Sequence, residues 1–277
     1  MKDKEADLTE AIDCNAIADV FAEIVIEAAV AVMAVYASDS HVERKADGSP
    51  VCDADVAAEA IILKRLAERL PKIPVLAEEA ASRGKIKVPK TAFILVDPVD
   101  GTKEFLSRNG EFTINIGLVI DAAPRAGAVY APAREELWIG GTTASIATVA
   151  PGAPLPPAGE RRAIHTRQAP KHGLTALVSR SHITSATEAF LARLPIAERQ
   201  EAGSSLKFCL IAEGRADIYP RCGPTMEWDT AAGDAVLRAA GGIVLDDTGS
   251  PLRYGKAEVQ FRNGPFVAWG DPELALV

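Results

Sequence analysis

The sequence predicts an α/β protein in which sheets are covered by helices. Apolar stretches of strand length alternate with segments of helical periodicity, and a proline-rich segment divides the chain near residue 160. The 277 residues are 48% hydrophobic, 25% charged and 5% aromatic, as in an ordinary globular protein with a sizeable core. We expect two halves, residues 1–160 and 161–277, with any functional site between them.

Two helices are predicted first. Within residues 11–37, Asp19, Glu23 and Glu27 fall at i, i+4 and i+8, so they share one face while apolar residues populate the other. These charges also interrupt the apolar run, so we expect a helix of a soluble protein and no integral membrane segment. A second helix is expected from about residue 53 to residue 70, where Pro71 stops it.

Strands and further helices follow in alternation. Strand patterns cover residues 73–76, 93–96, 112–120 and 127–130, and the proline-rich segment 149–159 predicts a loop. Beyond the loop we expect strands at 176–179, 216–219 and 242–245, and helices at 186–194, 205–213 and 229–240.

The charge balance limits the partners. A formal net charge of -8 argues against a nucleic-acid or anionic-membrane surface, which would need clustered Lys and Arg. An anionic substrate would then need local help, which divalent cations held by carboxylates can supply. The four cysteines are scattered without CxxC pairing and no secretory leader is visible, so we expect free thiols and a cytoplasmic protein.

Asp97 is the first polar residue after a buried-strand pattern, at the end where α/β folds commonly place ligands. Pro98 interrupts sheet pairing and Asp100 follows, so a tight turn would aim two carboxylates and the Val99 carbonyl at one point. Such hard oxygen ligands suit Mg²⁺. The alternative is a plain Asp-Pro turn.

Other polar residues have both a functional and an ordinary interpretation. Gly101 and Thr102 open a possible short helix whose amides and hydroxyl could bind a phosphate oxygen. Glu78 follows a strand pattern but could belong to a solvated loop. Asp229 could cap the helix that follows it, and Asp55 could be a surface acid favoured by a helix dipole.

Taken together, the ordered motifs resemble those of the inositol monophosphatase superfamily. They are Lys45 to Asp55, Glu78-Glu79, Asp97 to Thr102 and Trp228 to Gly233. Within that superfamily, Asp97 to Glu111, Ser179 to His182, Gly203 to Cys209 and Tyr219 to Arg221 are similar to the bacterial 3'(2'),5'-bisphosphate nucleotidases. Two departures are Cys52, where Thr is usual, and Ala77, where Ser or Gly is common.

The resemblance implies a five-layer αβαβα fold and a lithium-sensitive hydrolase that uses two or three Mg²⁺ ions. Its substrate would be adenosine 3',5'-bisphosphate, or its sulfated analogue, in sulfate assimilation. The implied metal ligands are Glu78, Asp97, the Val99 carbonyl, Asp100 and Asp229. The implied catalytic residues are Asp55, Glu78 and Thr102. The implied substrate contacts are Asp100, Gly101, Thr102, His182, Ser204, Lys207, Arg221 and Asp229.

Alternatives remain open at this level. A phosphatase of the same superfamily acting on inositol 1-phosphate or fructose 1,6-bisphosphate would use the same carboxylates. A noncatalytic sensor of adenosine bisphosphate would use the same nucleotide contacts. Some relatives associate peripherally with the inner membrane, so that location is a further expectation. The oligomeric state is not predicted.

Overall fold

The computed structural model describes residues 13–38, 42–44, 50–82, 91–180 and 183–276. Its helices are α1 (Cys14–Ala37), α2 (Asp53–Arg69), α3 (Glu78–Ser82), α4 (Thr102–Leu106), α5 (Ser185–Leu191), α6 (Leu206–Ala212) and α7 (Ala231–Ala239). Three short 3-10 helices are η1 (Ala158–Glu160), η2 (Ala257–Val259) and η3 (Leu274–Leu276).

Most strands belong to two large sheets. The first, in the order β3-β4-β5-β6-β7-β8-β9, is formed by β3 (Val75–Ala77), β4 (Ala92–Asp100), β5 (Thr113–Ile120), β6 (Ala123–Ala131), β7 (Glu136–Gly140), β8 (Ala144–Thr148) and β9 (Arg162–Ala163). The second, in the order β11-β10-β12-β16-β14, is formed by β10 (Leu174–Ser179), β11 (Ile196–Ala202), β12 (Ile218–Arg221), β14 (Ile243–Asp246) and β16 (Phe266–Trp269). Two small pairs are β1 (Val42–Arg44) with β2 (Pro50–Cys52), and β13 (Thr225–Met226) with β15 (Arg262–Asn263).

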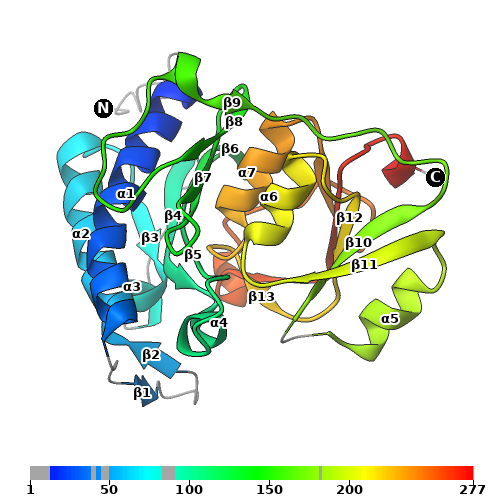
Figure 1. Cartoon of the computed structure of the whole chain (residues 1–277), viewed down its shortest axis with the longest axis horizontal. Coiled ribbons are helices and arrows are strands. Elements are labelled where there is room, and N and C mark those ends of the chain that lie inside the picture. Colours follow the sequence, from blue (N-terminus) through cyan, green and yellow to red (C-terminus); the bar gives the residue numbers. More distant parts are fainter. Residues whose placement is uncertain (1–12, 39–41, 45–49, 83–90, 181–182, 277) are drawn as a thin grey trace, which may run out of the picture.

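The helices and the two sheets form five layers (Figure 1). Helices α1 and α2 cover the outer face of the first sheet, α6 and α7 lie between the sheets, and α5 lies outside the second sheet. This is the αβαβα arrangement that the family resemblance implies. The division at residue 160 stays a prediction: β9 at residues 162–163 still extends the first sheet, and α7 of the second half packs on that sheet.

The first sheet is buried on both faces, as β4 illustrates. Successive side chains of a strand point to opposite faces. Ile94 and Val96 join the core beneath α1 and α2, whereas Phe93 and Leu95 join the core shared with α6 and α7. The continuous apolar run therefore reflects a central strand between two cores.

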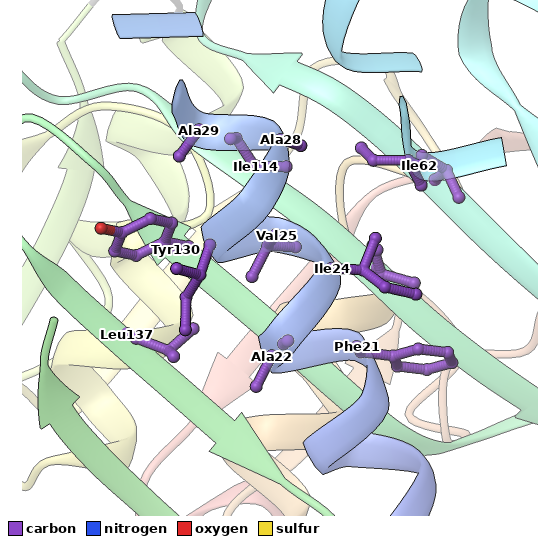
Figure 2. Packing of buried hydrophobic residues seen from close by; sticks show 14 of the residues in the cluster. Phe21, Ala22, Ile24, Val25, Ala28, Ala29, Ile62, Ile114, Tyr130 and Leu137 are labelled. Atoms are coloured by element: carbon purple, nitrogen blue, oxygen red, sulfur yellow. The ribbon is translucent and has the colours of Figure 1, made fainter. Parts of the chain in front are cut away.

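Helix α1 packs on the outer face of this sheet through residues such as Ala22, Val25 and Ala29, which lie on the side of Tyr130 and Leu137 (Figure 2). By length and hydropathy alone α1 could cross a membrane. Within its apolar 18-residue stretch, 44% is buried inside the protein. It packs beside α2 and on β5, β6 and β7, which is the position of a core helix.

The predicted acidic face of α1 carries ion pairs with neighbouring elements. Glu27 binds Arg65 and Glu23 binds Arg69, both on α2, at 2.8 and 2.9 Å, and Asp19 binds Arg161. The first two pairs are half exposed, so each adds little to stability. They fix which face of α1 turns toward α2.

A row of three glycines lets α7 approach the first sheet. Gly117, Gly127 and Gly140 are direct partners across β5, β6 and β7. A Cβ added at Gly127 would lie 2.6 Å from the Ala232 carbonyl oxygen, and one at Gly140 would lie 2.5 Å from the Val236 Cα. Because only glycine leaves this space, the row places α7, and with it the start of α7 beside the cavity described below.

The elements with clear periodicity are confirmed, and others were missed. Helix α2 and strand β5 lie within one residue of their predicted positions, α1 begins at Cys14 rather than residue 11, and β4 extends to Asp100. The sequence analysis did not predict α3, β7, β8, β11 or β16. Strand β11 carries mostly exposed polar residues because it is an edge strand, so it lacks a buried-strand pattern. Three cysteines have described side chains, Cys14, Cys209 and Cys222, and all three are free thiols as predicted.

Candidate active site

A cavity of about 650 Å³ gathers most of the predicted site residues. It lies where the ends of β3, β4 and β12 meet the segments leading into α6 and α7. Eight of the predicted residues line it: Glu78, Asp100, Gly101, Thr102, Ser204, Lys207, Arg221 and Asp229. Residues as far apart in the chain as Glu78 and Asp229 therefore share one cavity.

The Asp97 to Asp100 run forms a bulge of β4, so the expected tight turn is wrong. Asp97 pairs with Asn115 and Asp100 pairs with Thr113, so β4 has one more residue than β5 over this stretch. A bulge tolerates a proline, which cannot donate to the ladder, without ending the strand. The Val99 amide donates to Asp97 Oδ1 at 3.1 Å, which holds the bulge from inside.

Asp97 lies behind the cavity wall and is only 2% exposed. Burial raises the pKa of its carboxyl well above the usual range, and four neighbouring carboxylates raise it further: Glu78, Asp100, Asp229 and Asp55. Burial also raises the pKa of Asp229, with Asp100 and Glu78 adding to the effect. The five acids therefore form one electrostatic cluster.

The donor chemistry of this cluster fits a hard divalent cation. Carboxylate oxygens are what Mg²⁺ prefers, and a cation would relieve the mutual repulsion of buried negative charges. Among the described residues, no three His, Cys, Asp or Glu side chains converge into a compact metal cage. Instead, Asp97 and Asp229 accept hydrogen bonds from the Val99 and Met226 amides.

Asp229 does not cap α7 with its side chain. Its Oδ2 accepts the Met226 amide at 2.8 Å, and its carbonyl accepts the Ser205 hydroxyl at 2.6 Å. Ser205 in turn accepts a hydrogen bond from Asn115 of β5 at 3.1 Å. Asp229 is thus fixed from both the α6 segment and the first sheet, and its carboxylate faces the cavity rather than the helix amides.

Asp55 and Glu78 are likewise not the surface acids of the alternative interpretations. Asp55 lies in the first turn of α2 and is 2% exposed. Glu78 begins α3 and lines the cavity. The start of α3 is fixed from α2, because the buried Glu59 carboxylate accepts the Glu79 amide at 2.8 Å.

Gly101 links the bulge to α4 in a left-handed conformation, with φ of 88°. A Cβ there would lie 3.2 Å from both Glu104 Oε2 and Ser204 Cβ. Glycine therefore permits both the backbone turn and the close approach of Ser204 from the second half. Thr102 follows as the first residue of α4 and lines the cavity.

Lys207 is a buried cation beside the acids. Only 3% exposed, its ammonium donates to the carbonyls of Ala202 and Ser204 at 3.1 and 2.6 Å and lies 5.1 Å from the Tyr219 ring centre. Burial lowers the pKa of Lys207 to about 8, against the attraction of Asp100. Two backbone carbonyls leave one ammonium donor for another partner.

Arg221 ends β12 and supplies a second cation to the cavity. One terminal nitrogen donates to the Pro224 carbonyl at 3.1 Å, while the buried Nε finds no hydrogen-bond partner within the described part of the chain. A buried donor without a protein acceptor is uncommon and suits a ligand with acceptor oxygens.

The sequence analysis missed residues that complete the cavity. Arg262 and Met226 are direct partners on β15 and β13, and both line it, as does the exposed Ile183. Glu111 does not line the cavity but binds the Gly203 amide at 2.8 Å and also pairs with Arg134 and Arg180. No local pattern signals these roles, because they depend on contacts between distant segments.

Some predicted residues lie elsewhere. His182 lies outside the described residues, as do residues 45–49 of the first motif, and the Cys52 side chain lies outside the described part as well. Val99 is 2% exposed within the β4 bulge, and Ala77 is buried at the end of β3, directly before Glu78.

A layered αβαβα fold whose cavity brings carboxylates and basic side chains together suits a phosphatase that binds a metal and an anionic substrate. Residues 11–270 match the model of the Inositol monophosphatase family, and the chain belongs to that family. The chain is 44% identical to the 3'(2'),5'-bisphosphate nucleotidase CysQ of Escherichia coli O157:H7 over 227 residues. The match covers 81% of this chain and 88% of the relative. The CysQ of Buchnera aphidicola is 40% identical over 240 residues, 86% of this chain and 87% of the relative.

Solved structures agree with this assignment. CysQ from Bacteroides thetaiotaomicron is similar at a TM-score of 0.77 and 36% identity, over 92% of this chain and 97% of that one. An inositol monophosphatase from Zymomonas mobilis has a TM-score of 0.74 at 25% identity, over 96% and 97%. The fold, the family and the class of enzyme, a phosphatase, are therefore those that the sequence motifs predicted.

Proposed function

We propose that the protein is a Mg²⁺-dependent 3'(2'),5'-bisphosphate nucleotidase that hydrolyses adenosine 3',5'-bisphosphate to AMP and phosphate. One observation carries the proposal: a single cavity joins the acids Glu78, Asp100 and Asp229 to the cations Lys207 and Arg221. The curated CysQ relatives carry this activity in their names and are 40 to 44% identical to this chain. We also propose a cytoplasmic role in sulfate assimilation.

The residues that would hold two or three Mg²⁺ ions are Glu78, Asp97, the Val99 carbonyl, Asp100 and Asp229. Bound there, Mg²⁺ would supply Lewis-acid stabilisation of the charge on the phosphoryl and leaving oxygens. Asp97, behind the wall, would contribute from the buried side, while the other three carboxylates face the cavity. Burial of these acids favours a bound cation, because it leaves few waters to screen their repulsion.

Thr102 and Asp55 would orient the attacking water. Thr102 lines the cavity directly after Asp100 and Gly101, and Asp55 contributes its charge to the same acid cluster from α2. In-line phosphoryl transfer depends mainly on positioning and on electrostatic stabilisation. A hydroxyl and a carboxylate held on two helix starts are suited to positioning the water.

The second phosphate of the substrate would contact the basic residues. Lys207 keeps one donor beyond its two backbone carbonyls, and Arg221 has a buried Nε without a protein acceptor. Charge-assisted hydrogen bonds of this kind are about twice as strong as neutral ones. Arg262 of β15 adds a third cation to the lining. Ser204 and Gly101 line the cavity close to each other, and His182 is kept as a proposed contact.

The test is phosphate release with Mg²⁺, with and without lithium. The panel contains adenosine 3',5'-bisphosphate, its sulfated analogue, inositol 1-phosphate and fructose 1,6-bisphosphate. We expect the adenosine bisphosphate to have the highest kcat/KM and lithium to inhibit. A preference for inositol 1-phosphate or fructose 1,6-bisphosphate would assign the cavity to another phosphatase of the family. Tight binding of the nucleotide without turnover would indicate a sensor.

The variant Arg221→Gln tests whether Arg221 contributes to binding of the second phosphate of the substrate. It should raise KM for adenosine 3',5'-bisphosphate by about tenfold, the effect of one lost charge-assisted hydrogen bond, and affect inositol 1-phosphate much less. Arg193→Gln is the matched control, since Arg193 is exposed and outside the cavity. An equal loss on both substrates would show that Arg221 does not read the second phosphate.

A further inference from the structure

A second cavity, of about 410 Å³, lies away from the candidate active site and is lined by three arginines. Arg125, Arg238 and Arg253 surround it, and among its described lining residues there is no carboxylate. It shares no lining residue with the first cavity. In a protein with a net charge of -8, three arginines around one hollow are an unusual local concentration of positive charge.

Arg125 owes its direction to a bulge. Leu118 of β5 pairs with Ala126, and Val119 pairs with Pro124, so Arg125 is the extra residue of β6 between them. Bulges re-aim side chains in this way. Arg125 is exposed, and the described part of the chain supplies its guanidinium with no hydrogen bond or ion pair.

Arg253 is held at the same hollow by the turn between β5 and β6. Its guanidinium donates to the Asp121 carbonyl at 3.1 Å, and the following amide, that of Tyr254, donates to the Ala122 carbonyl at 3.1 Å. Asp121 and Ala122 have φ of 51° and 61°, so two non-glycine residues adopt the left-handed region here. The contacts with residues 253 and 254 help to hold this turn. They orient Arg253, whose guanidinium has no carboxylate partner among the described residues.

Arg238 has a different role, because its charge is already balanced. It binds the fully buried Asp234 at 2.6 and 3.3 Å, within α7. Arg238 therefore lines the cavity with its charge balanced by Asp234. The positive charge available to an anion comes from Arg125 and Arg253. Thr142, held by Asn15 at 2.7 Å, adds a further polar residue to the rim.

We propose that this cavity is a second anion-binding site, which takes the phosphate or sulfate group of a small molecule between Arg125 and Arg253. Planar guanidinium groups match the oxygens of tetrahedral oxyanions and stay charged at any physiological pH. The volume lies within the range of small-molecule sites, so a free oxyanion and the phosphate of a nucleotide both fit the same chemistry. This site is separate from the one that carries the proposed activity.

The experiment is calorimetric titration of the full chain with inorganic phosphate, sulfate and AMP, in the presence of a chelator to exclude Mg²⁺. We expect saturable binding by the wild type, about tenfold weaker binding after Arg125→Gln or Arg253→Gln, and none in the double variant. Both arginines are exposed, so these variants should fold, and unchanged thermal unfolding checks this. The matched control Arg193→Gln should bind as the wild type does.

Two results would overturn the proposal. One is the absence of saturable binding of all three probes by the wild type. The other is binding that survives in the double variant and disappears in Arg221→Gln, because the anion would then sit in the first cavity. Tighter binding of AMP than of phosphate identifies a nucleotide phosphate as the source of the oxyanion, and equal binding identifies the free ion.

Discussion

At the scale of the residue, Asp100 joins the two halves of the candidate site. Burial raises the pKa of its carboxyl, while the Lys207 charge and a hydrogen bond from Ser205 lower it. Lys207 and Ser205 come from the second half of the chain, whereas Asp100 ends β4 of the first. A single carboxylate thus interacts both with the other acids and with a buried cation.

The variant Asp100→Asn should lower turnover by more than about 100-fold, since losing even a residue that supports a metal ligand costs about 10- to 100-fold. The side chain keeps its size but loses a charge and half of its acceptor oxygens. Steady-state phosphate release measures the effect. Asp247→Asn, at an exposed position outside both cavities, is the control. Near-normal turnover by Asp100→Asn would sink the proposed role of this carboxylate.

At the scale of the element, the glycine row and α7 determine where Asp229 lies. The row brings the backbone of α7 directly onto β5, β6 and β7. Asp229 lies just before Thr230, the N-cap residue of that helix. The hydrogen bonds of Asp229 to Ser205 and Met226 depend on this placement. Packing of a helix on a sheet therefore sets the position of a candidate ligand.

The variant Gly127→Ala tests this coupling. Its methyl group would meet the Ala232 carbonyl oxygen at 2.6 Å, so the helix or the strand must move. We expect a loss of about 1 to 3 kcal/mol in the free energy of unfolding, as in overpacked cores, together with a lower kcat. Urea denaturation and phosphate release are the measurements. Gly159→Ala, where nothing lies within 4 Å, should change neither. Unchanged stability of Gly127→Ala would show that the row does not constrain α7.

At the scale of the whole molecule, five buried or cavity-facing acids from different layers gather around the end of β4. Their mutual repulsion opposes folding, and the surrounding layers keep them in place: Asp97 on β4, Asp55 on α2, and Asp229 ahead of α7. A cation that binds only this arrangement stabilises the folded state through mass action.

Thermal unfolding should therefore respond to Mg²⁺. At a hundredfold excess over Kd, binding stabilises by about 2.7 kcal/mol, which corresponds to an increase in Tm of roughly 4 to 8 °C. Calorimetric scans with MgCl2, and with NaCl at equal ionic strength as control, measure the shift. The double variant Asp97→Asn/Asp100→Asn should lose it. A shift that persists in this variant would place the stabilising cation elsewhere.

The sequence determined the elements whose pattern is local and the residue types of the site. Helix α1, helix α2 and strand β4 follow from periodicity, because each must bury a continuous face or both faces. The position of Glu78 directly after a strand also follows from local pattern, whereas Asp97 lies within β4 and not at its end. The motif order identified the family and its layered fold, which the comparisons confirm.

Only the tertiary structure decided which segments meet. It replaced the turn at Pro98 with a bulge, directed the Asp229 side chain to Met226 rather than to a helix end, and brought Arg262 into the first cavity. It also grouped Arg125 with Arg253 around the second. The physical reason is that a local pattern records whether a face is buried, whereas the partner that buries it is chosen by long-range strand pairing and helix packing.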